Sequence, residues 1–222
     1  MPDSDYSNDT RRAACVESIR TILATDGLQS ITLGEDLSMA AGSFLHMVTN
    51  PGMVTDLRID GRLMPCRWWP SSLEWDEDIA LKFANLRSLH LSNLELVIDV
   101  DLSVVSCPSV IRTLILDDVD ISLGRLVSVV GAGGVLKHLQ VTALNALEYD
   151  SDIREVLESC EVHSLVYKVK NEYWCQSETT LFDHDMQQQP TLKEIEMEGV
   201  YVDQEVVRAV CPWLERLEVV GT

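Results

Sequence analysis

The chain has 222 residues, of which 17 are Lys or Arg and 36 are Asp or Glu, so its formal net charge at pH 7 is −19. This charge argues against nucleic acid and against an anionic membrane surface, since both ligands require a basic face. Hydrophobic residues make up 46% of the chain and aromatic residues only 6%, which predicts a substantial and mainly aliphatic core. A basic protein partner is compatible with the charge, although solubility alone also explains it.

The N-terminal residues MPDSDYSNDTRR contain no apolar core of a signal peptide. No apolar run approaches the ~18 residues that a membrane helix needs. The six cysteines are widely spaced and form no Cys-x-x-Cys pair, so they match no zinc pattern. They predict reduced, mostly buried thiols in a cytoplasmic or nuclear protein without a cofactor. These cysteines are Cys15, Cys66, Cys107, Cys160, Cys175 and Cys211.

The first 27 residues predict a short tail followed by a capping helix. Residues 1–9 are polar and are expected to be disordered. Thr10 to Ala24 has the spacing of an amphipathic helix, and Gly27 can supply the left-handed turn that ends it. Residues 10–27 are therefore expected to cover the end of the following domain. The side chains expected to face inward are Cys15, Val16, Ile19, Ile22 and Leu23.

A six-residue pattern, apolar-x-x-apolar-x-apolar, recurs eight times from residue 28 onward. Its copies are LQSITL at 28–33, VTDLRI at 54–59, LRSLHL at 86–91, IRTLIL at 111–116, LKHLQV at 136–141, VHSLVY at 162–167, LKEIEM at 192–197 and LERLEV at 214–219. The third to sixth copies follow one another at steps of 25, 25 and 26 residues. Because leucine-rich repeats have periods of 20–29 residues, the copies predict one strand each in a repeat of this type.

Helical spacing between the copies predicts the other half of each repeat. Ser122 is expected to cap a helix that buries Leu123, Leu126, Val127 and Val130. The segments SDIREVLESC and DQEVVRAVC are expected to bury one face in the same way. The inward residues of these two segments are Ile153, Val156, Leu157, Val206, Val207 and Val210.

One strand–helix unit cannot be stable alone. It buries a few aliphatic side chains worth roughly 1.5–3 kcal/mol each, against about 1–2 kcal/mol of backbone entropy for every ordered residue. The units must therefore stack and share a core. The predicted fold is an α/β leucine-rich-repeat solenoid, or horseshoe, over residues 28–222, with parallel strands on the concave face and helices on the convex face. We expect adjacent parallel strands to bury Leu89, Leu91, Leu114, Leu116, Leu139 and Val141.

The final repeat resembles the cysteine-containing subclass of leucine-rich repeats found mostly in F-box proteins. Cys211-Pro212-Trp213-Leu214 matches the Cys-Pro-x-Leu element of that subclass, and Val202-Asp203 resembles its helix entry. Val119 and Val200 occupy the position of its internal cysteine. In that family the repeats choose the substrate of a ubiquitin ligase, and an F-box recruits the ligase. No F-box is found here, so the resemblance implies the recognition half alone, with a ligase adaptor bound only if an F-box lies elsewhere.

Residues between the apolar positions of each copy are expected to face outward on the concave sheet and to contact a partner. Three glutamates on one strand would repel one another unless a basic group lies opposite, which is compatible with a basic partner; the alternative is an exposed strand that is simply acidic in an acidic protein. The long loop 61–75 carries Trp68 and Trp69, and tryptophan is a common interface anchor; packing against the scaffold is the alternative. The expected contact residues are Asp56, Arg58, Asp60, His90, His138, Gln140, Glu194, Glu196 and Glu198.

No catalytic constellation or metal site is evident in the sequence. No Gly-x-Ser-x-Gly elbow or His-Glu-x-x-His motif occurs. Asp183-His184-Asp185 is expected to form a polar turn, with a metal site as the alternative. His90 and His138 lie two copies apart, roughly 10 Å at the ~4.8 Å strand spacing, which is too far to share one metal.

The sequence therefore predicts a non-catalytic protein-interaction module, in the manner of F-box-associated leucine-rich repeats. An acidic scaffold or chaperone for a basic protein is the alternative, and an enzyme or enzyme subunit is a more distant one. Nothing follows the last predicted strand except Gly221 and Thr222. Because a bare edge strand promotes association, we expect this end to continue into more chain, or to be covered by a partner or a second copy.

Overall fold

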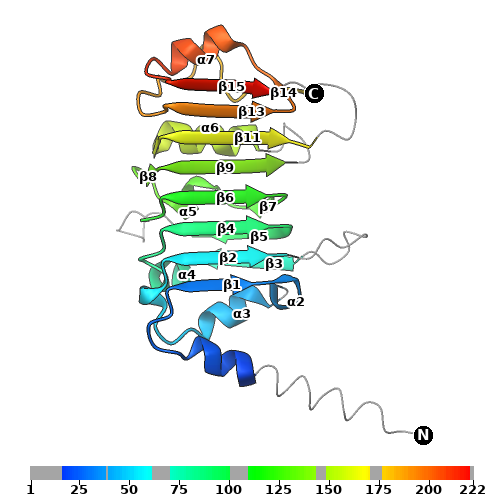
Figure 1. Cartoon of the computed structure of the whole chain (residues 1–222), viewed down its shortest axis with the longest axis vertical. Coiled ribbons are helices and arrows are strands. Elements are labelled where there is room, and N and C mark those ends of the chain that lie inside the picture. The colour runs from blue at the N-terminus through cyan, green and yellow to red at the C-terminus, as the bar shows by residue number, and fades with distance from the viewer. Residues whose placement is uncertain are drawn as a thin grey trace, which may run out of the picture.

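The computed structural model describes residues 17–38, 40–61, 71–100, 110–143, 149–170 and 177–220. Its main element is a sheet of eight parallel strands whose order in space follows their order in the chain (Figure 1). This arrangement confirms the α/β class. The strands, in order, are β1 (Ser30–Leu33), β2 (Asp56–Asp60), β4 (Ser88–Ser92), β6 (Thr113–Asp117), β9 (His138–Ala143), β11 (Ser164–Val169), β13 (Glu194–Glu198) and β15 (Arg216–Val220).

Each copy of the six-residue pattern forms one strand, which begins at the third residue of the copy. The strands pair in register, so that Ser88 lies beside Thr113 and Thr113 beside His138. The fourth and sixth residues of the copies point into the core. The predicted burial in adjacent parallel strands is confirmed, because no more than 1% of the surface of Leu89, Leu91, Leu114, Leu116, Leu139 and Val141 is exposed.

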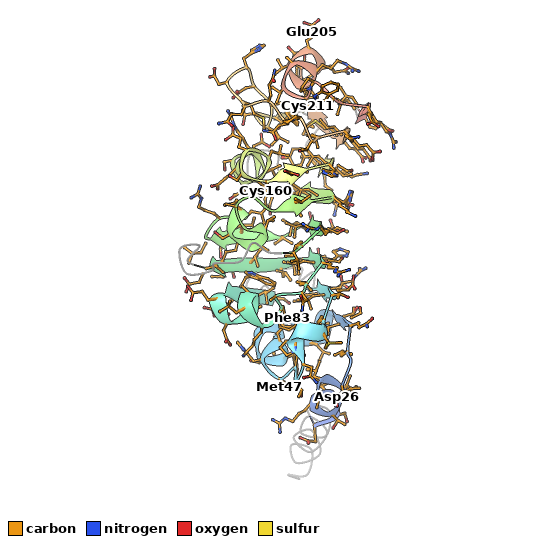
Figure 2. The ribbon with its side chains drawn as sticks, turned by 90° about the vertical axis from the view of Figure 1, so that its left-hand side faces the viewer. Asp26, Met47, Phe83, Cys160, Glu205 and Cys211 are labelled. Atoms are coloured by element: carbon orange, nitrogen blue, oxygen red, sulfur yellow. The ribbon has the colours of Figure 1, made fainter. Side chains whose placement is uncertain are left out.

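The layer behind the main sheet contains both strands and helices (Figure 2). A second parallel sheet consists of β3 (Ser71–Asp76), β5 (Leu94–Asp99) and β7 (Asp120–Leu123), and two-residue strands pair as β8 with β10 and β12 with β14. The helices on this side were predicted, whereas these additional strands were not. The other elements are α2 (Glu35–Ser38), α3 (Ala41–His46), η1 (Pro51–Met53), α4 (Glu77–Lys82), α5 (Val127–Val130), α6 (Asp150–Ser159), α7 (Gln204–Val210), β8 (Val135–Leu136), β10 (Glu161–Val162), β12 (Ser177–Glu178) and β14 (Val200–Tyr201).

The helices of the later copies follow the predicted spacing, whereas the helix after β6 begins later than predicted. Ser122 does not cap it, because Ser122 and Leu123 belong to β7 and Leu123 is 60% exposed. Leu126 is the N-cap of α5 instead. Asp203 caps α7 by accepting hydrogen bonds from the N–H groups of Glu205 and Val206. The predicted core residues Leu126, Val127, Val130, Ile153, Val156, Leu157, Val206, Val207 and Val210 are all buried.

Residues 17–23 are helical and form the described part of the predicted N-terminal helix. Leu23 is buried, but Ile22 is 60% exposed, so its inward placement was wrong. Adjacent helical residues differ by about 100°, and Leu23 occupies the inward direction at this point. Gly27 has the expected left-handed conformation, with φ of 79°. Residues 1–16, and with them the predicted tail, lie outside the described residues.

The turns that follow the main strands repeat one hydrogen bond. The N–H groups of Gly61, Asn93 and Asp118 each donate to the carbonyl oxygen at the end of the next strand, over 2.6–2.9 Å. Asn93 and Asp118 adopt φ of 52° and 53°, in the left-handed region that asparagine and aspartate tolerate better than most residues. These turns keep the strand ends aligned. No helix in the described chain is long and apolar enough to cross a membrane.

Two of the six cysteines, Cys160 and Cys211, lie in the described chain, and both are buried free thiols. Burial raises the pKa of Cys211 to about 12 and also raises the pKa of Cys160. The prediction of buried thiols is confirmed for this pair. The other four cysteines lie outside the described residues.

We expect neither Cys160 nor Cys211 to react with iodoacetamide at pH 8 in the folded protein, because the reacting thiolate is scarce and covered. Site-resolved mass spectrometry measures the labelling. The same chain in guanidinium chloride provides the control, in which both thiols should react. Rapid labelling of either thiol without denaturant would contradict its burial.

Candidate functional site

The side of the main sheet away from the helices carries the outward side chains of the eight strands (Figure 2). We call this side the open face. Its residues form three rows across the strands, because the strands pair in register. The first row is Ser30, Asp56, Ser88, Thr113, His138, Ser164, Glu194 and Arg216. The second is Thr32, Arg58, His90, Ile115, Gln140, Val166, Glu196 and Glu218. The third is Asp60, Ser92, Asp117, Thr142, Lys168, Glu198 and Val220.

All nine predicted contact residues on the copies lie on the open face. They fall into separate groups. Asp56, Arg58 and Asp60 are on β2, and the three glutamates are on β13. Four strands separate these groups, which places them roughly 24 Å apart at about 4.8 Å per strand. His90, His138 and Gln140 lie between them. Trp68 and Trp69 lie outside the described residues.

The centre of the open face carries no carboxylate, ammonium or guanidinium group. The first two rows contain no Asp, Glu, Lys or Arg on β4, β6, β9 and β11, and every side chain there is partly exposed. This surface, which we call the central patch, has side chains of small or medium size on a hydrogen-bonded sheet. It can contact a partner without desolvating a carboxylate, ammonium or guanidinium group. Its residues are Ser88, His90, Thr113, Ile115, His138, Gln140, Ser164 and Val166.

The two imidazoles of the central patch differ in their surroundings. Desolvation lowers the pKa of His90, and the positive charge of Arg58 lowers it further, against the opposing carboxylates of Asp60 and Asp117. His90 is therefore neutral at pH 7. His138 lies on β9, and its Nδ1 is 3.3 Å from the hydroxyl oxygen of Ser164 on β11. The rings are two strands apart, as the sequence predicted.

Two charged residues of β2, Arg58 and Asp60, bind each other. The Arg58 Nε donates to both oxygens of Asp60, at 2.8 and 2.9 Å, and the Ser92 hydroxyl on β4 donates to Asp60 at 2.8 Å. Desolvation opposes ionisation of Asp60, but these hydrogen bonds outweigh it and its pKa is lowered. A lowered pKa stabilises the fold above the ordinary aspartate value, and this contribution is lost as the pH falls through the folded-state pKa.

The three glutamates of β13 have a cation beside them within the chain. Lys168 on β11 binds Glu196 at 2.7 Å and Glu198 at 3.2 Å, and these hydrogen bonds raise its pKa. On the other side, Arg216 of β15 is paired in register with Glu194 and binds Glu218 at 2.5 Å. The basic group expected opposite the glutamates is therefore at least partly intramolecular. This weakens the argument for a basic partner.

Lys170 connects strands that are not neighbours. It follows β11 and binds Asp117 at 3.0 Å and Asp118 at 2.8 Å, at the end of β6. Its pKa is raised, because the two hydrogen bonds outweigh the desolvation that lowers it. The ion pairs reach across β9, which lies between the two strands. These ion pairs connect the residue after β11 to Asp117, which belongs to the third row of the open face.

The sequence pattern places Lys168 outward on the concave face without predicting its ion pairs, and Lys170, Arg216 and Glu218 were not singled out. Lys168, Arg216 and Glu218 occupy outward positions of their copies, so the same alternation that predicted the other contacts would have indicated them. Lys170 follows its strand and reaches 52 residues back to Asp118. The local pattern contains no signal for such a contact.

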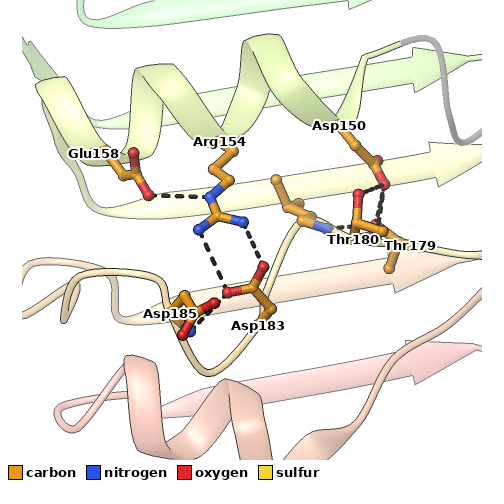
Figure 3. Close-up of polar contacts among 8 residues, drawn as sticks. Asp150, Arg154, Glu158, Thr179, Thr180, Asp183 and Asp185 are labelled. Atoms are coloured by element: carbon orange, nitrogen blue, oxygen red, sulfur yellow. Dashed lines mark hydrogen bonds and ion pairs between the residues drawn. The ribbon is translucent and has the colours of Figure 1, made fainter.

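Asp183, His184 and Asp185 form a polar turn in which Asp183 binds Arg154 of α6 and accepts the N–H of Asp185 (Figure 3). Among the described residues, no three potential metal ligands lie together. A pocket of about 310 Å³ lies behind the sheet, between α3 and β3. Its polar lining consists of Ser43, His46, Ser72, Glu74 and Asp76. His46 is 3.3 Å from Asp78, which also binds Lys82.

Comparison with known proteins gives no match: no protein-family model, curated protein or solved structure is significantly similar to this chain.

Proposed function

We propose that this chain is a leucine-rich-repeat solenoid that binds another protein on its open face and performs no catalysis. The observation that carries the proposal is the central patch. It is partly exposed, contains no Asp, Glu, Lys or Arg, and is continuous over four adjacent strands of the main sheet. The cores of protein interfaces are depleted of charge, and their rims are polar. The charged residues of β2 and β13 fit such a rim.

The role we favour is substrate recognition in the manner of the F-box-associated repeats, in the cytoplasm or nucleus. The supporting features are the Cys-Pro-x-Leu element at residues 211–214 and the buried Cys211 and Val200. A link to ubiquitination requires an F-box elsewhere, in this protein or in a partner. The fold itself is compatible with many binding functions, so the identity of the bound protein decides the role.

An acidic scaffold or chaperone for a basic protein is the second candidate. The net charge of −19 and the four glutamates on β13 and β15 favour it. We rank it second because Lys168 and Arg216 bind three of these glutamates. Salt would weaken binding strongly in this case, since exposed charges are screened beyond about 8–10 Å at physiological ionic strength.

We expect Gln140→Arg to weaken partner binding at least about tenfold, because a charge buried without a partner costs more than about 1.4 kcal/mol. Gln140 is partly exposed at the middle of the central patch. The matched control is Gln188→Arg, which introduces the same charge at an exposed position between β12 and β13. The partner is identified by affinity capture and the dissociation constants are then measured by calorimetry.

The proteins captured also separate the candidate roles. Adaptors of the ubiquitin machinery, together with a substrate, would support recognition of the F-box type, and histone-like basic proteins would support the acidic scaffold. Equal affinity of the partner for Gln140→Arg and Gln188→Arg, with both variants folded, would exclude the central patch as the binding surface.

A further inference from the structure

The second residue of the six-residue pattern directly precedes each strand of the main sheet, and in three adjacent copies it is positively charged. These residues are Arg87, Arg112 and Lys137, which we call the basic row. They lie side by side, because the N–H of Arg112 donates to the carbonyl oxygen of Arg87 at 2.7 Å and that of Lys137 to Arg112 at 2.8 Å. The row spans roughly 10 Å at about 4.8 Å per strand. It lies at the edge where the strands begin, which faces the viewer in Figure 2.

The cations of the basic row form no ion pair with any described residue. Arg87 and Lys137 are exposed, and Arg112 is half-buried and donates one hydrogen bond to the carbonyl oxygen of Val135 at 2.8 Å. Every other described lysine and arginine except Arg208 is bound to a carboxylate of the chain. Arg208 lies apart on α7. The unpaired positive charge of the described residues is therefore concentrated in the basic row.

This arrangement is unfavourable for the chain alone, because like charges on neighbouring strands repel one another. The chain has 36 acidic residues and only 17 basic ones, yet the segments that carry the row contain no acidic residue. These segments are residues 83–88, 110–113 and 131–138. An anionic ligand that bridges the cations would relieve the repulsion and accept charge-assisted hydrogen bonds from the guanidinium and ammonium groups.

The basic row borders the central patch. Each of its cations directly precedes a residue of the first row of the open face, and these three residues belong to the central patch. A protein seated on the central patch therefore reaches the basic row with a segment at the border of the contact, where charged contacts are usual. The adjacent pairs are Arg87 with Ser88, Arg112 with Thr113 and Lys137 with His138.

We propose that the basic row binds an extended segment of the partner protein that is rich in Asp and Glu. The inference rests on the proposed function, since the partner of the central patch supplies this segment. In an extended segment, alternate side chains point the same way and lie about 7 Å apart. Two carboxylates at alternate positions thus fit a row of roughly 10 Å whose side chains are long and flexible. The segment crosses the strands at the edge where they begin.

Two other kinds of anion fit the basic row less well. A single phosphate group is bound by donors that converge on one point, whereas these cations form a line. Nucleic acid is a long line of charge, and on both sides of the row it would meet carboxylates. Asp56 lies on the strand before Arg87, and Glu194 and Glu215 lie beyond Lys137. A short acidic segment ends before it reaches these groups.

Fluorescence anisotropy with a labelled peptide in which Glu alternates with Ser tests the proposal. The full chain should bind this peptide at low salt, and R87Q/K137Q should bind it at least about fivefold more weakly, because two exposed charge contacts are lost. Added salt should weaken binding. The matched control R20Q/R208Q removes the same charge from exposed positions outside the row and should bind like the natural chain. Circular dichroism should show unchanged folding in both variants, since all four side chains are exposed.

Equal binding of the Glu peptide to R87Q/K137Q and R20Q/R208Q would overturn the proposal, as would no binding to the natural chain at millimolar peptide. Row-dependent binding of only a phosphoserine peptide of the same spacing, or of only a single-stranded oligonucleotide, would overturn the assignment to Asp and Glu. With the captured partner, binding lost in Gln140→Arg but unchanged in R87Q/K137Q would reject the basic row and leave the proposed function standing. The reverse result would reject the central patch and support the row.

Discussion

Asp150→Ala is expected to lower the free energy of unfolding by about 3 kcal/mol or more, because it leaves several buried donors without their acceptor. Asp150 is 4% exposed at the start of α6. One of its oxygens accepts the Tyr167 hydroxyl at 2.8 Å. The other accepts the Thr179 hydroxyl at 2.9 Å, and the Thr180 N–H and hydroxyl at 2.7 and 3.2 Å (Figure 3). Urea unfolding followed by circular dichroism measures the change.

Two further variants separate loss of these hydrogen bonds from a general effect on the helix. Ser151→Ala changes the next residue of α6, which is exposed, and should alter stability by no more than about 0.5 kcal/mol. Asp150→Asn keeps one acceptor oxygen and should fall between the two. If Asp150→Ala were as stable as Ser151→Ala, the hydrogen bonds of Asp150 would contribute nothing measurable to the fold.

The hydrogen bonds of Asp150 could not be predicted from the sequence, although the helix that carries it could. The helical spacing of SDIREVLESC, residues 151–160, predicted α6 and its buried face, since both depend on local periodicity. Thr179 and Thr180 lie about 30 residues further on and contact α6 through Asp150. The ion pair of Arg154 with Asp183 spans 29 residues in the same way. Polar contacts between residues about 30 positions apart follow no period in the sequence, so the sequence pattern does not predict them.

The main sheet was predictable because its signal is repeated. Six apolar-patterned residues are ambiguous once, but eight copies with similar steps constrain one another. The copies also determined which side chains are outward, and hence most of the open face. What the alternation did not indicate is which outward charges bind one another. The pairing of Lys168 with Glu196 and Glu198 depends on side-chain conformation, which the alternation does not determine. Because this pairing supplies a cation within the chain, the three glutamates of β13 are weaker evidence for a basic partner.

Part of the segment with the tryptophans forms a strand, β3, that the sequence analysis did not predict. The sequence analysis places residues 71–75 in a loop, although Leu73 and Trp75 alternate with the polar residues Ser72, Glu74 and Asp76. The strand buries Leu73 and Trp75 and pairs with β5. Trp75, 3% exposed, is thus a core residue. Alternation at period two indicates a strand, but the six-residue pattern predicts only the strands of the main sheet.

Gly61→Ala is expected to destabilise the protein by about 2 kcal/mol or more, because a side chain here would overlap the backbone of the next turn. Gly61 is buried directly after β2, and its N–H donates to the carbonyl oxygen of Ser92 at 2.6 Å. An added Cβ would lie 2.7 Å from the carbonyl carbon of Asn93 and 2.9 Å from the Ser92 oxygen. These are backbone atoms of a paired strand, so relief requires moving β4 away from β2.

Gly34→Ala is the matched control for this substitution, because an added Cβ at Gly34 meets nothing within 4 Å. It follows β1 and should change stability by no more than about 0.5 kcal/mol, or raise it slightly by restricting the unfolded chain. Chemical unfolding of both variants under the same conditions compares them. Equal midpoints would mean that the ends of β2 and β4 can separate at little cost, contrary to the close backbone contact at Gly61.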